Sequence, residues 1–444
     1  GKPDNDFLVY LPVYDMWNDI PGRFVGFDIH KMDQYAPKFI KTIQTIMAGG
    51  YDVDYISDSF IKSTSCQDGM LKTRGGACYK ALIVPAVKLI PVSTLKKLVA
   101  LARQGATVVF VEHYPEDVPG YASLKQNREQ LFALLEQLPG EKSFRGTQAF
   151  NFGKGRIIVG SDYHETLERT GVPAEELKTR WGVQFIRRTH TEGHHYFISD
   201  LQANDVEGWV TLNVPEKHIM CFDPMTGKRG IAKTREVEGK TQVYMQLKSG
   251  ESIILQTFTR SLQGEPEWKY RKEMDYSLSL DHGWKLRFVE SYPAIEGEFK
   301  IDTPSSWTEI AHPAAKINRG TALYSLELDL PELSADDWVL DLGDVRESAR
   351  VRINGQEAGI AWAAPFRLSI GQLLKSGKNL IEVEVTNLPA NSIAEMDRQG
   401  KQWRIFEDIN MAKLNYEKGT YGHWETLPSG LNGIVRLIPV KYLF

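Results

Sequence analysis

Aromatic and polar side chains that suit contact with a sugar lie close together in the last third of the chain. An aromatic ring packs on the apolar face of a pyranose, while amide, carboxylate and guanidinium groups form hydrogen bonds with its hydroxyls. The residues of these types are Trp362, Arg367, Asn387, Asn391 and Trp403. We expect a sugar contact in this group, with the alternative that Trp362 only covers the sheet beneath it.

A second candidate segment, residues 14–26 (YDMWNDIPGRFVG), follows the first apolar run of the chain. If that run is a strand of a parallel sheet, the segment lies at the carboxyl edge, where such folds usually bind ligands. Trp17, Asn18, Asp19 and Arg23 are then placed to meet a sugar or another domain. We expect Trp17 to be a sugar-binding candidate, and packing on a neighbouring domain is the alternative.

Catalytic motifs are harder to find. Most glycosidases use a pair of carboxylates, and Glu347, Glu357, Glu395 and Asp397 fit solvated surface residues better than such a pair. The turn after residues 81–85 (ALIVP) reads AVKLIPV, without the nucleophile that an amidotransferase requires. Dinucleotide-binding and P-loop motifs are also absent from the sequence. We therefore assign no catalytic residue.

Three histidines, His190, His194 and His195, include an HxxxH spacing that binds metal when it lies on a helix. Glu192-Gly193 interrupts the spacing, and the residues that follow alternate as in a strand. The segment therefore predicts a turn leading into a strand, and no metal ligand is named.

Cys66 and Cys78 lie in a glycine-rich loop. A disulfide between them, which typically contributes about 3 kcal/mol, is plausible in an exported protein. Two free thiols are the alternative. The polar start of the chain, GKPDND, leads us to expect that a targeting segment or a larger upstream region has been removed.

The bulk composition excludes two classes of partner. The net charge is −4, so no basic field favours nucleic acid. Apolar runs stay well below the roughly 18 residues of a membrane helix. A chain of 444 residues has room for two to four domains.

The periodicity along the chain predicts a multidomain α/β plus all-β protein. Apolar runs alternate with helical patterns at first, which predicts a parallel sheet of flavodoxin-like or amidotransferase-like type. Short alternating strands follow, typical of a small β-sandwich. The predicted segments are 1–160 (α/β domain), 161–187 (helical connector), 188–260 (small β-sandwich), 261–279 (linker) and 280–444 (second β-sandwich).

Residues 338–387 carry the strongest local signals. The pair Asn354-Gly355 predicts a two-residue hairpin turn, because both positions of that turn need positive φ. Residues 357–370 (EAGIAWAAPFRLSI) are predicted as one strand, and residues 32–47 as one helix. Residues 390–428 are irregular and aromatic, with Trp403, Tyr416, Tyr421 and Trp424, and long irregular insertions often carry function.

These motifs resemble a known family. The run LDLGDVRESARVRINGQEAGIAWAAPFRLSI, followed by LLKSGKNLIEVEVTNLPAN, resembles the C-terminal sandwich of glycoside hydrolase family 106, the α-L-rhamnosidases, and more loosely the sugar-binding domain of family 2 hydrolases. DFLVYLPVYDMW and HHYFISDLQANDVEGWVTL resemble segments that follow the catalytic barrel of family 106. The resemblance covers nearly the whole chain, and residues 338–387 are its most specific part.

The resemblance implies a galactose-binding-like jelly roll over residues 280–444 and an exported protein. It also implies α-L-rhamnoside hydrolysis assisted by calcium, with catalytic carboxylates in an N-terminal (β/α)8 barrel. Three domains leave no room for a barrel of about 250 residues. The implied partners are a rhamnose-containing, plant-type polysaccharide or oligosaccharide and a catalytic barrel in cis or trans, with no nucleic acid and no membrane.

Three functions follow from this reading. The first is an accessory region that supports a barrel and binds sugar. The second is a self-sufficient hydrolase, with acidic residues of 390–428 facing the 14–26 segment. The third is a structural or oligomerisation module, because the α/β domain resembles the trimerisation domain of some β-galactosidases.

Overall fold

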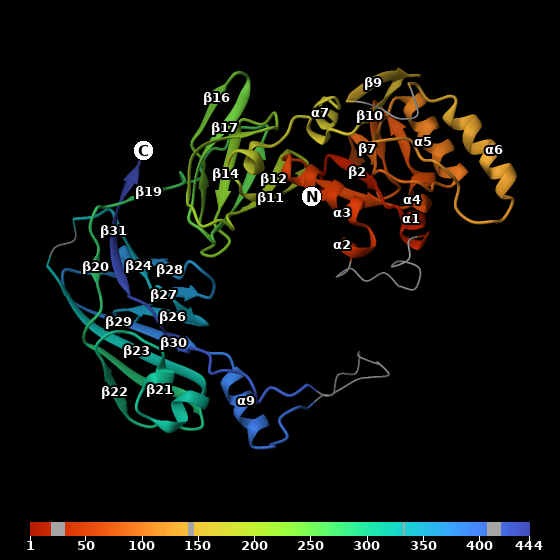
Figure 1. The fold of residues 1–444 in the computed structure, drawn as a ribbon. Coiled ribbons are helices and arrows are strands. Elements are labelled where there is room, and N and C mark those ends of the chain that lie inside the picture. The colour runs from red at the N-terminus through yellow and green to blue at the C-terminus, as the bar shows by residue number, and fades with distance from the viewer. Residues whose placement is uncertain (19–31, 141–145, 332–333, 406–418) are drawn as a thin grey trace. The chain divides into compact units, whose positions relative to one another are not determined.

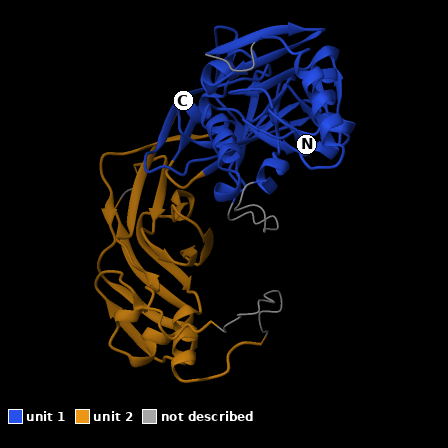
Figure 2. Cartoon of the chain, turned by 45° about the vertical axis from the view of Figure 1, so that its right-hand side comes forward, with its two compact units in different colours: residues 1–247, 252–268 blue, residues 248–251, 269–444 orange. Residues whose placement is uncertain are grey.

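The computed structural model describes residues 1–18, 32–140, 146–331, 334–405 and 419–444 (Figure 1). The chain divides into two compact units (Figure 2). The first unit holds residues 1–247 and 252–268, and the second holds 248–251 and 269–444. Both are mostly β, with several sheets and few helices. The finer boundaries at 160, 187, 260 and 279 stay predictions.

A largely parallel six-stranded sheet forms the first part of the first unit. The order is β3-β2-β7-β8-β10-β9, and only β9 runs antiparallel to its neighbour. The strands are β2 (Phe7–Tyr10), β3 (Val53–Ile56), β7 (Ala81–Val84), β8 (Thr107–Val111), β9 (Thr147–Phe152) and β10 (Gly155–Gly160). Strand β7 matches the apolar run at residues 81–85, and β2, β7 and β8 are buried along their whole length, as expected for central strands of a parallel sheet.

Helices cover both faces of this sheet, so alternate residues of each strand enter different cores. Leu8 and Tyr10 of β2 pack in one core, and Phe7 and Val9 pack in the other. The helices of the unit are α1 (Val13–Asn18), α2 (Met32–Tyr35), α3 (Pro37–Ala48), α4 (Asp58–Ser63), α5 (Val92–Gln104), α6 (Leu124–Leu135), α7 (Tyr163–Glu168) and α8 (Glu176–Thr179).

The single helix predicted for residues 32–47 is wrong. The structure has α2 and α3 instead, separated at Ala36. Pro37 is the cause, because proline favours the first turn of a helix and disfavours the helical conformation in the residue before it. Strand β9 was missed because Thr147–Phe152 is mostly exposed and its apolar pattern is weak.

Two antiparallel sheets complete the first unit and enclose a separate core. One has the order β1-β11-β12-β18-β14-β15, and the other has the order β13-β17-β16. Their strands are β1 (Lys2–Pro3), β11 (Gln184–His190), β12 (Gly193–Ser199), β13 (Val206–Leu212), β14 (His218–Phe222), β15 (Arg229–Ile231), β16 (Thr234–Val237), β17 (Lys240–Leu247) and β18 (Ser252–Phe258).

One buried arginine joins the parallel sheet to the antiparallel sheet beside it. Arg187 of β11 has a side chain that is 4% exposed, and its guanidinium contacts Asp4 at 2.5 Å, Asp6 at 2.9 Å and Glu175 at 2.7 Å. Burial alone would lower the pKa of Arg187, but Tyr196 and these carboxylates outweigh it and raise the pKa. The guanidinium is therefore charged at every pH at which the protein folds.

The carboxylates around Arg187 are themselves fully engaged. Asp6 also accepts hydrogen bonds from Lys80 Nζ at 2.8 Å and the backbone N–H of Asp52 at 3.1 Å. Glu175 is completely buried and accepts from the Tyr196 hydroxyl at 2.8 Å. Asp6, Asp52 and Lys80 directly precede β2, β3 and β7, so the cluster closes the amino edge of the parallel sheet.

A small sheet, β4 (Ser65–Gln67), β5 (Met70–Lys72) and β6 (Cys78–Tyr79), carries two of the cysteines. Cys66 is opposite Leu71, and Leu71 is opposite Tyr79. Cys78 is the neighbour of Tyr79 and therefore lies on the other face of the sheet, two strands away from Cys66. Both are free thiols in the structure, and so is Cys221.

The second unit is built from two larger antiparallel sheets and a short one. The orders are β22-β21-β23-β29-β26-β27, β19-β31-β24-β28 with β20 beside β31, and β25-β30. The strands are β19 (Tyr270–Glu273), β20 (Leu278–Ser279), β21 (Trp284–Tyr292), β22 (Glu298–Ile301), β23 (Arg319–Leu330), β24 (Asp337–Asp341), β25 (Val345–Arg346), β26 (Ser348–Ile353), β27 (Gln356–Ala361), β28 (Arg367–Ser369), β29 (Gly377–Thr386), β30 (Gly430–Leu431) and β31 (Arg436–Leu443). Helix α9 (Ala390–Arg398) follows β29.

The strongest local prediction in this unit is confirmed, and a neighbouring one is wrong. Asn354 and Gly355 have φ of 53° and 78° and connect β26 to β27. Residues 357–370 are not one strand, because the chain leaves β27 after Ala361, passes Pro365 and joins a different sheet as β28. Proline lacks the N–H that a continuing central strand needs.

We predict that Arg187→Ala lowers the free energy of unfolding of the first unit by about 3–5 kcal/mol, because Asp6 and Glu175 would remain buried without their counter-charge. Urea denaturation followed by circular dichroism measures the change. The matched control is Arg188→Ala, the next residue of β11, which is exposed and should shift stability by about 0.5 kcal/mol or less. Equal losses in the two variants would contradict this role for Arg187.

Candidate functional site

Helix α9 and the segment that follows residue 419 are joined by side chains of the helix. Asn391, in the first turn of α9, donates to the Leu427 carbonyl and accepts from the Leu427 N–H, both at 2.8 Å. Arg398, two turns further along, donates to the carbonyls of Gly422 at 2.9 Å and Trp424 at 2.8 Å. The helix therefore fixes the backbone on which the nearby aromatic residues are placed.

Three aromatic rings and an arginine pack together beside α9, and we call Trp403, Tyr421, Trp424, Arg404 and Asp397 the α9 cluster. The ring centroids of Trp403 and Tyr421 are 5.7 Å apart, and those of Tyr421 and Trp424 are 4.6 Å apart. The Arg404 guanidinium lies 5.1 Å from the centroids of both Trp403 and Tyr421. Trp424 is 38% exposed. Partly exposed rings beside polar groups are the composition of a sugar-binding surface.

Asp397 holds the α9 cluster in place. Its carboxylate accepts hydrogen bonds from the backbone N–H of Tyr421 and from the Trp403 indole, the latter at 2.6 Å. These two bonds lower the pKa of Asp397. Hydrogen bonds from Gln399 and Arg398 likewise lower the pKa of Glu395. A general acid needs the opposite shift, so neither carboxylate has the properties of a glycosidase acid.

The structure places the two predicted asparagines in structural roles. Asn387 accepts from the Gly320 N–H at 3.0 Å and donates to the Asn318 carbonyl at 3.0 Å and Ser429 Oγ at 3.1 Å. Asn391 is buried and bonded to Leu427 as described above. Because the N–H groups of both amides are engaged inside the protein, these side chains are poor partners for sugar hydroxyls.

Arg367 is also bound within the protein. Its Nη2 lies 2.9 Å from Glu273, its Nε lies 3.5 Å from Asp341, and its side chain is 15% exposed. Trp362, in contrast, is 62% exposed. Ala361, the residue before Trp362, is opposite Ala349 of β26, and Thr386, the residue before Asn387, is opposite Ser348 of the same strand. Trp362 and Asn387 therefore lie at the same end of the sheet.

Trp17 belongs to α1 in the first unit and is 56% exposed, with its ring edge-on to Tyr14 at 6.0 Å. Asp19 and Arg23 of the predicted loop lie outside the described residues, as does Tyr416. Sugar contact by Trp17, Trp362 and Trp403 stays a prediction. Arg404 was missed because only the fold of the insertion places its guanidinium against two rings.

The carboxyl edge of the parallel sheet carries an unusual backbone position. Glu112 follows β8 directly and has a φ of 65°, a conformation that non-glycine residues adopt at a cost. Its carboxylate lies 4.0 Å from Lys38 and is exposed. The residue at this turn is a carboxylate rather than a thiol or hydroxyl, so the turn lacks an amidotransferase nucleophile.

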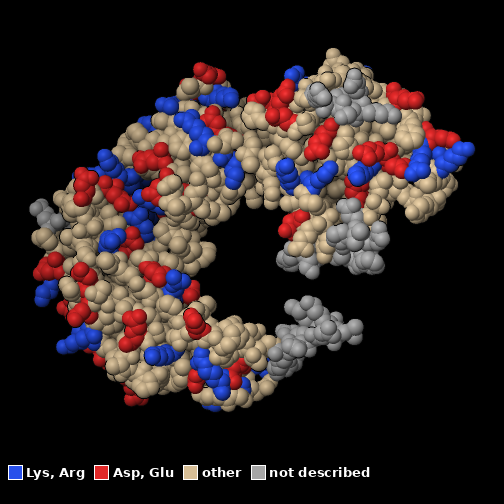
Figure 3. Space-filling view, in the orientation of Figure 1, with Lys and Arg blue, Asp and Glu red and all other residues tan. Residues whose placement is uncertain are grey.

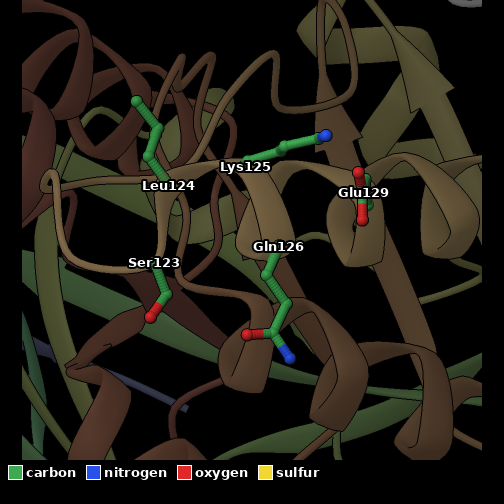
Figure 4. Close-up of a pocket in the computed structure, with 5 residues that line it drawn as sticks. All are labelled: Ser123, Leu124, Lys125, Gln126 and Glu129. Carbon is green, nitrogen blue, oxygen red and sulfur yellow. The ribbon is translucent and has the colours of Figure 1, made fainter.

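A hollow of about 470 Å³ lies at the start of α6 (Figure 4). The described residues that line it come from a single stretch of the chain: Ser123, Leu124, Lys125, Gln126 and Glu129. No aromatic ring is among them, so the hollow does not match the sugar-binding composition.

Within the described residues, no group of three or more His, Cys, Asp or Glu side chains is arranged to hold a metal ion. His190 ends β11 and His194 and His195 lie in β12, which confirms the predicted turn into a strand. His194 instead pairs with Glu216 at 3.0 Å.

Charges of both signs are interspersed on the face seen in Figure 3. This mixture agrees with the small net charge of −4 and gives no extended basic surface on that face. No helix among the described residues is both long and apolar enough to cross a membrane.

Comparison with known proteins agrees with the resemblance found in the sequence. The family model of glycoside hydrolase family 106, described as alpha-L-rhamnosidase, matches residues 22–234. A solved rhamnosidase from Novosphingobium sp. PP1Y superposes with a TM-score of 0.70 at 23% identity, over 99% of this chain and 39% of that one. The chain thus resembles family 106 in sequence and shares its fold with that rhamnosidase.

A curated relative, a putative beta-glucuronidase from Formosa agariphila, is 29% identical over 40% of this chain and 17% of its own length. The chain therefore spans well under half the length of both proteins. The run at 338–387, which the sequence analysis treats as most specific, lies outside the residues that the family model matches.

We predict that acid loosens the α9 cluster only below the usual pKa range of aspartate, about pH 3.9. The lowered pKa of Asp397 stabilises the folded state above that range, and this contribution is lost as pH falls through the folded pKa. The Trp403 indole N–H resonance, assigned with Trp403→Phe, should stay constant from neutral pH to about pH 4. Asp397→Asn should shift this resonance at neutral pH and abolish its change at acid pH, whereas Glu395→Gln should have neither effect. A change in the Trp403 resonance of the unmodified chain near pH 5 would contradict the prediction.

Proposed function

We propose that this chain is the accessory, barrel-supporting and sugar-binding region of a rhamnosidase-like glycoside hydrolase. The observation that carries the proposal is the family 106 resemblance of a chain whose described sheets include no closed eight-stranded barrel. The substrate of the whole enzyme would then be a rhamnose-containing glycan, and export from the cell would give access to it.

The topology supports the finer domain assignments that we propose. In chain order, β3-β2-β7-β8-β10 is the sequence 2-1-3-4-5, which is the strand order of flavodoxin-like sheets. We therefore assign a flavodoxin-like or amidotransferase-like domain without its nucleophile. In the second unit, two antiparallel sheets around one core agree with a galactose-binding-like jelly roll.

An exposed apolar pair supports contact with the remainder of a larger enzyme. Ile186 of β11 and Phe197 of β12 are directly opposite in register and are 54% and 42% exposed. Ile254 continues the same row on β18. Contiguous apolar side chains on an open sheet face are typical of a surface that another domain covers. We propose that this row of side chains contacts the barrel-containing part of the parent protein.

The α9 cluster is the proposed sugar contact of the second unit. Trp403 and Trp424 offer ring surface, and Arg404 is the cation beside them. Asp397 orients Trp403 rather than serving as an acid, so this surface supports recognition without bond cleavage. The purified chain should therefore bind sugar and leave a glycosidic bond intact.

We predict that the chain releases no aryl group from an aryl α-L-rhamnoside, with or without calcium, because its described sheets include no closed eight-stranded barrel of the kind that carries the catalytic carboxylates implied by the resemblance. A chromogenic assay measures this directly. Turnover that survives purification to homogeneity would show that a catalytic pair lies within the 444 residues.

We further predict that Trp403→Ala weakens binding of a rhamnose-containing oligosaccharide about tenfold, which corresponds to about 1.4 kcal/mol. Loss of the ring removes both stacking area and the partner of Asp397. Isothermal titration calorimetry measures the affinity. Tyr121→Ala, an aromatic that is 93% exposed in the first unit, is the control and should bind like the unmodified chain. Failure of the intact chain to bind any such oligosaccharide would remove the binding half of the proposal.

A further inference from the structure

Strands β16 and β17, labelled in Figure 1, form a three-stranded sheet with β13. The outer face of this sheet carries aromatic and polar side chains. Alternation along the strands sends Val210, Val243 and Met245 into the core of the unit. The residues between them face outward. By this alternation they are Glu207, Trp209 and Thr211 of β13, Gln242, Tyr244 and Gln246 of β17, and Arg235 of β16, and of these Thr211 is buried, with 4% exposed.

The pairing register arranges these residues in three rows across the strands. Glu207 is opposite Gln246, Trp209 is opposite Tyr244, and Thr211 is opposite Gln242. Arg235 is opposite Gln242 on the other side and extends the third row. The two aromatic rings thus occupy the middle row, with hydrogen-bonding side chains on both sides of it. We call this set the β13–β17 platform.

The central rings of the β13–β17 platform are held by direct contacts. Trp209 and Tyr244 have centroids 5.4 Å apart with planes at 72°, and the Arg235 guanidinium lies 4.3 Å from the Trp209 centroid. Arg235 Nε donates to Gln242 at 2.8 Å, and Gln242 donates to Thr211 at 3.1 Å. The side chains are therefore ordered before any ligand arrives, which lowers the entropic cost of binding.

The first row supplies a carboxylate. Glu207 Oε1 accepts from the Tyr244 hydroxyl at 2.8 Å and from Gln246 Nε2 at 3.0 Å. Burial, reinforced by Glu207, raises the pKa of Tyr244 to about 12, so the phenol stays a neutral donor at physiological pH. Both bonds end on one oxygen of Glu207, and an ionised carboxylate has further acceptor capacity on its two oxygens.

The backbone beneath Trp209 is fixed by a close approach. Gly208 has a φ of 150°, and a Cβ at this position would lie 2.7 Å from the Trp181 ring. Trp181 packs on the core of the two antiparallel sheets. The strand thus packs on the partly buried indole of Trp181 on the side opposite the β13–β17 platform, which restricts movement of the backbone beneath Trp209.

We propose that the β13–β17 platform is a second glycan-binding surface that recognises a neutral, rhamnose-type oligosaccharide. An open sandwich face is ordinarily covered by separate, solvated side chains. Here an indole and a phenol are bordered by a carboxylate, two amides and a guanidinium, which match the apolar face and the hydroxyls of a sugar ring. A 6-deoxy sugar also presents a methyl group, which suits the exposed part of the Trp209–Tyr244 pair.

The choice of a rhamnose-type sugar rests on the proposed function, whereas the platform itself rests on the contacts described here. Balanced charge favours a neutral sugar, because Glu207 and Arg235 flank the rings from opposite rows. A uronic acid is less favourable, because its carboxylate would lie close to the carboxylate of Glu207.

Fluorine NMR of the full chain labelled with 5-fluorotryptophan tests the inference at each tryptophan separately. Trp209→Phe assigns one resonance and Trp403→Phe assigns another, and Trp307, which is fully buried, is the internal reference. Titration with a rhamnose-containing oligosaccharide should shift the Trp209 resonance in a saturable way. Trp307 should not move.

Affinity measurements on variants complete the test. Trp209→Ala should weaken binding at this surface at least tenfold, and Glu207→Gln should weaken it severalfold while leaving the thermal midpoint nearly unchanged. Lys240→Ala, an exposed residue at the end of β17 on the same hairpin, is the matched control and should bind normally.

Three outcomes are decisive. A shift at Trp403 without one at Trp209 overturns the inference and leaves the proposed function intact. No shift at either residue overturns this surface together with the sugar-binding half of the proposed function. A shift at Trp209 with a uronate oligosaccharide that lacks rhamnose, but not with rhamnosides, overturns the assigned sugar.

Discussion

The buried charge of Arg187 is the constraint on which the first unit depends. A guanidinium removed from water is tolerated only when carboxylates and hydrogen bonds surround it. Its partners come from the first residues of the chain (Asp4 and Asp6) and from the segment before α8 (Glu175), so both segments have to meet β11 at one point. This requirement explains why the parallel sheet and the antiparallel sheets form a single compact unit.

The cluster around Arg187 also makes the two edges of the parallel sheet different in character. The amino edge is occupied by Asp6, Asp52, Lys80 and Arg187, whose polar groups bind one another. The carboxyl edge carries Glu112 in its left-handed conformation and the α1 segment with Trp17. Stability is therefore concentrated at one edge, and the edge that usually binds ligands is left for other roles.

Local signals in the sequence were sufficient wherever a few consecutive residues determine the outcome. The hairpin at Asn354-Gly355 is such a case. Two of the wrong predictions involve proline acting against a favourable pattern. Pro37 divides one helical pattern, and Pro365 divides a run whose alternation suggests one strand.

Side-chain partners that are distant in the sequence could not be predicted from local patterns. Asn387 and Arg367 have the residue types of sugar contacts, but their partners lie 67 and 94 residues away in the sequence. Whether an amide or guanidinium is available to a ligand depends on those partners. The β13–β17 platform is hidden in the same way, because Trp209, Tyr244 and Arg235 meet only through strand register.

The two aromatic surfaces share one physical arrangement. In each, a carboxylate accepts a hydrogen bond from an aromatic side chain, Asp397 from the Trp403 indole and Glu207 from the Tyr244 phenol. Such a bond orients the ring and leaves the carboxylate as an acceptor, whereas a glycosidase acid must carry a proton that it can donate. Recognition of a sugar needs ordered rings and hydrogen-bond acceptors. Bond cleavage needs a carboxyl group that is not held as an acceptor by hydrogen bonds of this kind. Both surfaces supply ordered rings and acceptors, and under the proposed function the carboxylate for bond cleavage belongs to the barrel-containing part of the parent protein.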